Sequence, residues 1–82
     1  MYYIYELCGK NDYLVKISKK IDLNSLEEKL KLLDFVLIEK NEDSIALKNN
    51  EKNILIYSFG EIIFINFSRE EVINLLNKIF IN

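Results

Sequence analysis

Residues 54–65 read ILIYSFGEIIFI, two apolar runs on either side of Ser58-Phe59-Gly60. Short runs rich in Ile, Tyr and Phe are typical of β-strands. Gly60 suits the left-handed position that closes a three-residue hairpin loop. Since such a loop pairs Tyr57 with Glu61, we expect an antiparallel hairpin formed by Ile54 to Tyr57 and by Glu61 to Phe67.

Both faces of this hairpin are apolar, whereas a sheet covered on one side normally alternates apolar and polar residues. We expect helices to cover the face with Ile54, Ile56, Ile62 and Phe64. The other face then lies open, and a group of apolar side chains left in water usually marks an interaction surface. Two alternatives stay open: the Tyr-rich N-terminal segment folds over this face, or a two-residue loop exchanges the faces. The predicted binding face consists of Leu55, Tyr57, Phe59, Ile63 and Ile65, beside Glu61.

Four further strands are expected, over residues 1–7, 13–17, 35–40 and 44–48. In the first strand, alternation places Tyr3 and Tyr5 on one face and Tyr2 on the other. All three rings could therefore not stack on nucleic-acid bases together, and a place in the core or in an edge strand is favoured.

Two helices complete the pattern. Asp22 is the expected N-cap of the first, with Asn24 as the rival cap, and Glu27 and Lys31 form an i,i+4 pair on it. Ser68 and Glu71 form a capping box at the start of the second. Each helix carries one apolar stripe: Leu23, Leu26, Leu30 and Leu33 in the first, and Val72, Leu75, Leu76 and Ile79 in the second.

The order strand-strand-helix-strand-strand-strand-strand-helix predicts the α+β class, an antiparallel sheet with both helices packed on one face. The 82 residues suffice for one domain, residues 1–82. No apolar run approaches the ~20 residues of a membrane span, and MYYIYEL does not read as a secretory signal, so we expect a cytoplasmic protein without a membrane partner.

Composition excludes much chemistry. With no His and one Cys, the chain has no His-based acid–base pair, internal disulfide or Cys-rich zinc site. Cys8 lacks an activating His, and the carboxylates of Asp12, Asp22, Asp34 and Asp43 have no ligand-spaced loop. We therefore expect no catalytic residue, no metal and no cofactor. Lys16, Lys19 and Lys20 are the densest basic cluster, either a phosphate contact or a solvated strand end, the latter being favoured.

From Tyr13 to Phe80 the chain resembles one repeat of the TATA-box-binding protein. Lys20-Ile21-Asp22-Leu23 resembles that family's helix opening, Leu55 to Asn66 its fourth and fifth strands, and Ser68-Arg69-Glu70-Glu71 its last helix start. The segment from Ile54 to Phe64, followed by Ser68 to Glu71, also resembles an uncharacterised domain of mitochondrial proteins. The first resemblance implies a TBP-like fold, with residues 1–7 as an extra N-terminal strand.

The resemblance further implies that the open sheet face binds a ligand, as that family binds the DNA minor groove. Tyr57 matches an aromatic wedge and Ile63 a groove-contacting Val. Ile65 and Glu61 replace Thr and Lys, which removes a hydroxyl and places a carboxylate where phosphate would lie. We therefore expect a non-enzymatic binding module that binds a protein partner or forms a homodimer. The alternatives are a transcription-associated homodimeric saddle that binds DNA, and a substrate-binding accessory domain of a separate nucleic-acid enzyme.

Overall fold

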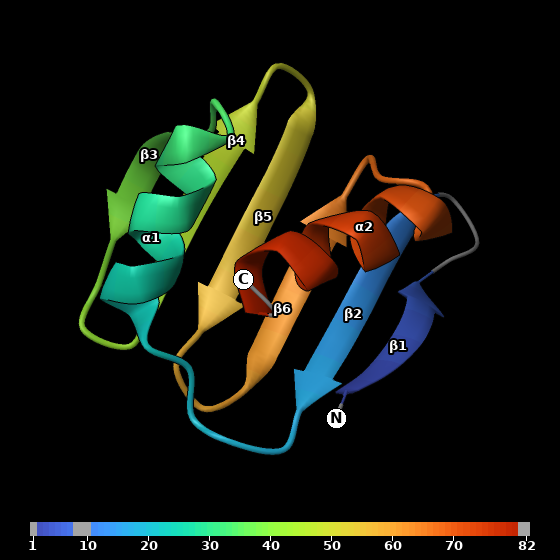
Figure 1. Ribbon diagram of the computed structural model, residues 1–82, viewed down its shortest axis with the longest axis horizontal. Helices are drawn as coiled ribbons and strands as arrows, with labels where there is room; N and C mark the ends of the chain where they lie inside the picture. The colour runs from blue at the N-terminus through green and yellow to red at the C-terminus, as the bar shows by residue number, and fades with distance from the viewer. Residues whose placement is uncertain (1, 8–10, 81–82) are drawn as a thin grey trace.

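The computed structural model describes residues 2–7 and 11–80. It confirms the α+β class and the expected order of the elements, and the six strands form one antiparallel sheet in the order β1-β2-β6-β5-β4-β3. Both helices lie on the same side of this sheet (Figure 1). The elements are β1 (Tyr2–Leu7), β2 (Asp12–Ile17), α1 (Leu23–Leu32), β3 (Val36–Lys40), β4 (Ser44–Asn49), β5 (Lys52–Tyr57), β6 (Glu61–Ile65) and α2 (Arg69–Phe80).

The hairpin of β5 and β6 has the expected register, with Tyr57 opposite Glu61 and Ile54 opposite Phe64. Gly60 closes its loop at φ +114°, and a Cβ there would lie 2.5 Å from the carbonyl oxygen of Ile17. The loop therefore packs directly on the end of β2, where the Ile17 N–H donates to the Gly60 carbonyl at 2.8 Å. The alternative two-residue loop, with exchanged faces, is wrong.

The core lies between the sheet and the helices. The hairpin residues expected there, Ile54, Ile56, Ile62 and Phe64, are all 0% exposed. Every residue of the α2 stripe is buried, and in α1 Leu26 and Leu30 are buried while Leu23 and Leu33 pack against the core. The remaining core residues from the sheet and its connections are Tyr13, Val15, Ile21, Phe35, Ile45, Leu47 and Phe67.

The helix caps fix both helix starts. Asp22 rather than Asn24 caps α1, because its Oδ1 accepts the Ser25 N–H at 3.3 Å. The capping box of α2 is complete: Ser68 N–H donates to Glu71 Oε1 at 2.8 Å, and Glu71 N–H donates to Ser68 Oγ at 3.1 Å.

The last strand is shorter than expected. It ends at Ile65 and not at Phe67, because Asn66 takes a left-handed conformation at φ +67°. The chain turns there, and Phe67 enters the core, where its ring meets that of Phe64 edge-on at 5.1 Å between centroids. Phe35 likewise precedes β3 as a core residue and is not part of the strand.

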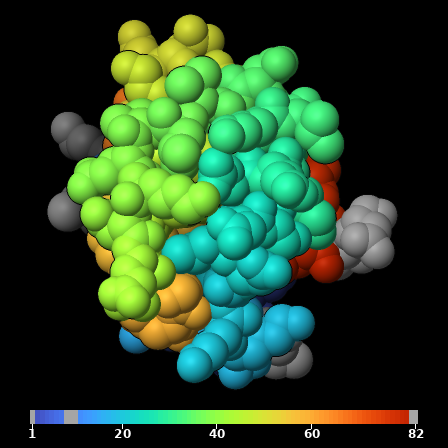
Figure 2. Space-filling model, turned by 90° about the vertical axis from the view of Figure 1, so that its left-hand side faces the viewer, coloured from blue at the N-terminus to red at the C-terminus, as the bar shows by residue number. Residues whose placement is uncertain are grey.

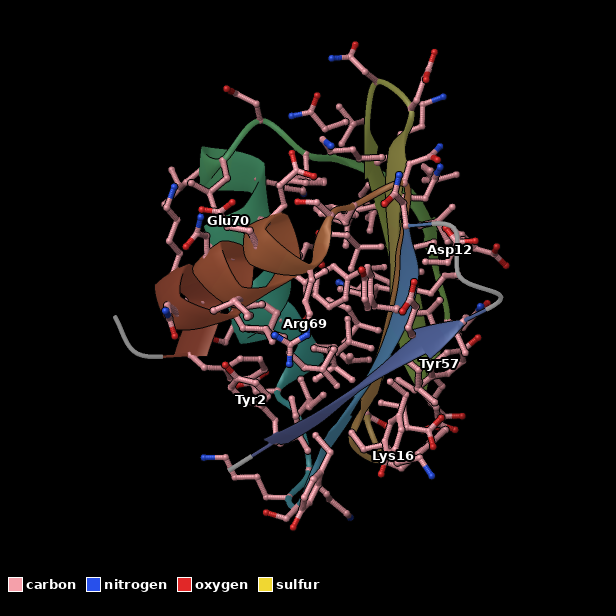
Figure 3. All side chains as sticks on the ribbon, turned by 90° about the vertical axis from the view of Figure 1, so that its right-hand side faces the viewer. Tyr2, Asp12, Lys16, Tyr57, Arg69 and Glu70 are labelled. Atoms are coloured by element: carbon pink, nitrogen blue, oxygen red, sulfur yellow. The ribbon has the colours of Figure 1, made fainter. Side chains whose placement is uncertain are left out.

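The N-terminal segment extends the sheet, so the alternative in which it folds over the open face is wrong. Strand β1 pairs with β2 along its length, from Tyr2 opposite Ile17 to Leu7 opposite Asp12. Tyr3 and Tyr5 are 59% and 47% exposed, whereas Tyr2 packs against the core on the helix side (Figure 3). The expected division of the tyrosines between two faces is confirmed.

Strand β3 contains a β-bulge that sequence alternation does not reveal. Leu37 lies opposite Leu47, but Glu39 and not Ile38 lies opposite Ala46. Ile38 is thus an extra residue on the side of Ala46, and the following Lys40 lies opposite Ile45 on the helix side. There the Lys40 ammonium reaches Glu27 Oε1 of α1 at 3.0 Å. Figure 2 shows β3 and α1 side by side, with nothing over the outer edge of β3.

Candidate binding face

The side of the sheet opposite the helices carries side chains that strand pairing arranges in rows across the strands. We call this side the helix-free face. Its middle row is apolar over five successive strands, since each member lies opposite the next: Tyr5, Leu14, Ile63, Leu55 and Ala46. At ~4.8 Å between strands, this row is roughly 19 Å long.

The two flanking rows contain charged side chains together with apolar and hydroxyl-bearing side chains. One row contains Tyr3, Lys16, Glu61, Tyr57 and Ser44, and the other contains Leu7, Asp12, Ile65, Asn53, Lys48 and Val36. Lys16 and Glu61 are 3.9 Å apart, and the Lys16 ammonium lies 6.0 Å from the Tyr5 ring centroid. Lys16, Asp12 and Tyr57 point away from the helices in Figure 3. The middle row is thus bordered by polar groups of both signs.

All five residues of the predicted binding face belong to this surface. Leu55, Tyr57, Ile63 and Ile65 are partly exposed on the strands. Phe59 is 63% exposed in the hairpin loop, where its ring stacks on that of Tyr57 at 5.4 Å between centroids. The hairpin loop therefore extends the face beyond the end of the strands.

The face is wider than the sequence indicated, because all four strands outside the hairpin also contribute to it. The pairing of β2 with β6 brings in Leu14, and β1 adds Tyr3 and Tyr5. At the opposite edge, Val36 and Ile38 of β3 are 64% and 54% exposed. Alternation within each strand was a usable signal for these side chains, but the order of the strands in the sheet was needed to join them.

The exposed apolar area on this face is large for so small a protein. Tyr3, Tyr5 and Phe59 are 59%, 47% and 63% exposed. Because a whole aromatic side chain offers ~150–250 Å², these three leave on the order of 300 Å² in water. The aliphatic side chains add to this value. The largest apolar patch on a typical monomer covers ~300–600 Å² and is often functional.

A small hollow interrupts the face between β5 and the bulged edge strand. Its volume is about 130 Å³, and Tyr57, Leu55, Ala46, Ser44, Asn41 and Glu39 line most of it. Three of these side chains are apolar or aromatic, and Glu39 supplies a carboxylate. The hollow thus suits a long side chain with an alkyl stem and a cationic end.

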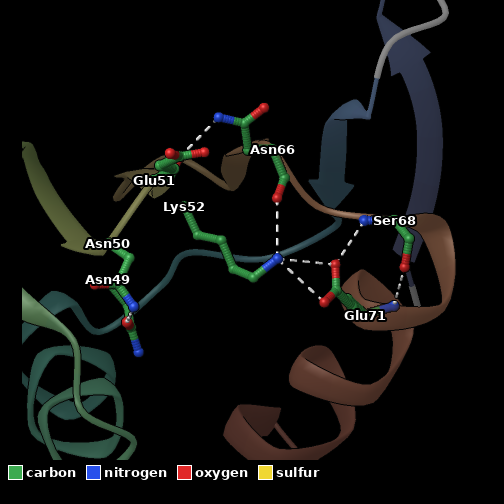
Figure 4. A network of polar contacts seen from close by, with 7 residues as sticks. All are labelled: Asn49, Asn50, Glu51, Lys52, Asn66, Ser68 and Glu71. Atoms are coloured by element: carbon green, nitrogen blue, oxygen red, sulfur yellow. Dashed lines mark hydrogen bonds and ion pairs between the residues drawn. The ribbon is translucent and has the colours of Figure 1, made fainter.

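Away from this face, polar residues hold elements together. Lys52 of β5 donates to the Asn66 carbonyl at 3.1 Å and lies 3.1 Å from each Glu71 carboxylate oxygen (Figure 4). The Ser68 backbone N–H and then Lys52 lower the pKa of Glu71. A hollow of about 720 Å³ beside Lys52 is lined by Asn11, Asn49, Asn50, Glu51 and Asn66. The polar contacts around Lys52 tie the start of α2 to the sheet.

A second ionic cluster ties α1 to the edge of the sheet. Glu27 is 8% exposed and lies 2.8 Å from Lys31 and 3.0 Å from Lys40. Hydrogen bonds from Lys31 and then Lys40 lower the pKa of Glu27. The expected i,i+4 pair is therefore present, and the bulge in β3 supplies its second cation.

The other candidate residues lie in several separate places in the described part of the chain. Among residues 2–7 and 11–80, no three acidic or thiol groups lie close enough together to hold a metal ion. Asp22 caps α1, and Asp34 takes a left-handed conformation, φ +73°, after that helix. Cys8 lies outside the described residues. Lys16 lies on the helix-free face, whereas Lys19 and Lys20 line a cavity near the end of α2.

In the described part of the chain, neither helix is long and apolar enough to cross a membrane. Comparison of the chain with family models, with curated proteins and with solved structures finds no match.

Proposed function

We propose that this protein is a non-enzymatic, cytoplasmic binding module whose helix-free face binds a protein partner. The observation that carries this proposal is the apolar middle row, which crosses five strands without a charged residue. Folding gains little from these partly exposed side chains, whereas covering them in a complex recovers ~25 cal/mol per Å² of apolar surface.

The polar groups on the face favour a protein over a nucleic acid. Glu61 and Asp12 lie on it beside the apolar row, and Glu61 lies 3.9 Å from Lys16. A phosphate backbone needs an excess of Lys and Arg to replace its counterions, and this face has no such excess. Apolar side chains bordered by charges of both signs instead match the apolar core and polar rim of a protein–protein interface.

The likeness to the TATA-box-binding protein supports the use of this face. The order of elements from β2 to α2 is the one that the resemblance implies, and that family binds its ligand on the same side of the sheet. The replacement of Lys by Glu61 and of Thr by Ile65 removes the groups suited to DNA. We therefore infer a related surface with a different class of partner.

Photo-crosslinking in the native cell tests this proposal. A photoreactive phenylalanine replaces Tyr57 on the helix-free face, and in a control it replaces Asn77, an exposed residue of α2. We expect a protein adduct from position 57 and none from position 77. Absence of an adduct at position 57, or equal adducts from both positions, would refute the proposed function.

Substitution of the face provides the matching loss-of-function test. Tyr57→Asp combined with Ile63→Asp should leave the circular dichroism spectrum unchanged and abolish crosslinking from a photoreactive residue at position 55. A protein that no longer folds would show instead that these two side chains belong to the core.

A further inference from the structure

We propose that the partner of the helix-free face is a second copy of this chain, packed face to face about a two-fold axis that runs along the strands between β5 and β6. This inference rests on the proposed function, since it uses the same face. It adds the identity of the partner and the pairing of residues across the interface.

Such an axis places β6 of one copy over β5 of the other, and β2 over β4. In the middle row, Ile63 then faces Leu55 of the second copy, and Leu14 faces the small Ala46. Two packed sheets lie ~10 Å apart with their side chains interdigitated, so a large side chain opposite a small one fills the space well. The apolar rows of the two copies thus cover each other.

The same axis brings opposite charges together. Asp12 of β2 faces Lys48 of β4 in the second copy, and this contact occurs twice in the dimer. Glu61 faces Tyr57, whose hydroxyl can donate to the carboxylate. A two-fold interface requires a surface that is complementary to itself, and these contacts satisfy that requirement.

The hollow beside Tyr57 has an occupant in this arrangement. Lys16 faces Ser44 of the second copy, which lines the hollow together with Glu39. The alkyl stem of Lys16 can lie along Tyr57 and Ala46 while its ammonium reaches the Glu39 carboxylate. Each copy therefore offers both the hollow and the side chain that fills it.

Another two-fold axis, across the strands, is disfavoured. It would also bring Lys16 near Asp12, but it would set Glu61 against Ile65 and Tyr57 against Asn53. Glu61 would then gain no partner from the second copy, and burying a carboxylate that keeps only its 3.9 Å contact with Lys16 is expensive. The axis along the strands leaves no carboxylate of the three rows without a partner.

A dimer interface of standard size would take a modest share of the surface. A standard interface uses ~800 Å² of each partner. The described residues expose 5390 Å², so the interface takes about 15% of that surface. The helix-free face is one of the two broad sides of a molecule that measures 29 × 29 × 24 Å.

Charge exchange tests the pairing in solution. By analytical ultracentrifugation over a range of concentrations, we expect the wild type to be a dimer of the 9.8 kDa chain. Asp12→Lys and Lys48→Asp should each weaken the dimer at least ~100-fold, because each creates two like-charge contacts. An equimolar mixture of the two variants should dimerise again, since every contact then pairs opposite charges. Glu28→Lys, an equal charge change on the exposed side of α1, should have no effect.

Circular dichroism on each variant distinguishes loss of the dimer from loss of folding. The mixture keeps the test decisive, because the dimer returns only if position 12 of one copy faces position 48 of the other. A monomeric wild type, or a mixture that stays monomeric, overturns the inference. If position 57 then crosslinks to a protein of another mass, the proposed function stands without the inferred dimer. If position 57 yields no adduct, both the proposed function and the inferred dimer are refuted.

Discussion

Ile62 and Ile63 are adjacent in the chain and identical in chemistry, but they lie on opposite faces of β6. Ile62 is 0% exposed among the core residues, whereas Ile63 is partly exposed in the middle row of the helix-free face. Replacing each in turn with Thr keeps a β-branched residue in the strand, so that strand propensity changes little. The difference between the two variants therefore measures the two environments.

The expected cost differs severalfold. Ile62→Thr removes about two buried carbon groups, worth ~0.8 kcal/mol each, and buries a hydroxyl without a partner at a cost of ~1–3 kcal/mol. The sum is about 2.5–4.5 kcal/mol. Ile63→Thr loses only part of the apolar contact, and its hydroxyl reaches water, so the cost is about 1 kcal/mol or less. For 82 residues the whole free energy of unfolding is roughly 4–12 kcal/mol.

Urea unfolding followed by far-ultraviolet circular dichroism measures both values. At low protein concentration, Ile62→Thr should lose a large part of its stability while Ile63→Thr unfolds near the wild-type midpoint. If the two copies associate as inferred, the penalty for Ile63→Thr should increase with protein concentration and that for Ile62→Thr should not. Equal losses at every concentration would contradict the assignment of Ile63 to a free face.

Three further predictions concern the loop, the ionic cluster and the ligand class. Gly60→Ala should lower the free energy of unfolding by about 2–4 kcal/mol, since a left-handed residue costs ~1–2 kcal/mol and the clash with the Ile17 carbonyl about as much again. Urea unfolding of the neighbouring variant Phe59→Ala should show a loss of less than ~1 kcal/mol. The lowered pKa of Glu27 means that its stabilising effect is present above the ordinary value of 4.5 and is lost as the pH falls below it. Thermal unfolding should therefore show that Glu27→Gln loses less stability on acidification than the wild type. If the variant and the wild type lose equal stability, the ionic cluster around Glu27 does not stabilise the fold. An A/T-rich duplex titrated at low salt should show no saturable rise in fluorescence anisotropy, because Glu61 and Asp12 face the sheet's open side, and binding that weakens with salt would favour the DNA-binding saddle instead.

Local patterns were sufficient to predict the helices and the central hairpin. The capping box of Ser68 and Glu71, the Asp22 cap and the left-handed Gly60 each depend on residues a few positions apart. Such interactions are encoded within one turn or one loop, and the sequence therefore shows them directly.

The width of the helix-free face was beyond the reach of local patterns. The contact of Leu14 with Ile63 depends on the pairing of β2 with β6, strands that are almost fifty residues apart in the chain. Alternation assigned Tyr3 and Tyr5 to one face of their own strand but could not state which strands are neighbours. The end of β6 at Ile65 was also missed, because the left-handed Asn66 that follows it stands within an apolar run.

The bulge in β3 has a consequence for how this strand tolerates changes in length. The bulge accommodates Ile38 as an extra residue, so that Lys40 still lies opposite Ile45 on the side of Glu27. Substitution at position 38 alters one exposed side chain, and deletion of that residue would leave Leu37, Glu39 and Lys40 opposite Leu47, Ala46 and Ile45 in regular alternation. The outermost strand should thus accept many residue types at position 38 and also the removal of the position itself, with the contact between Lys40 and Glu27 retained.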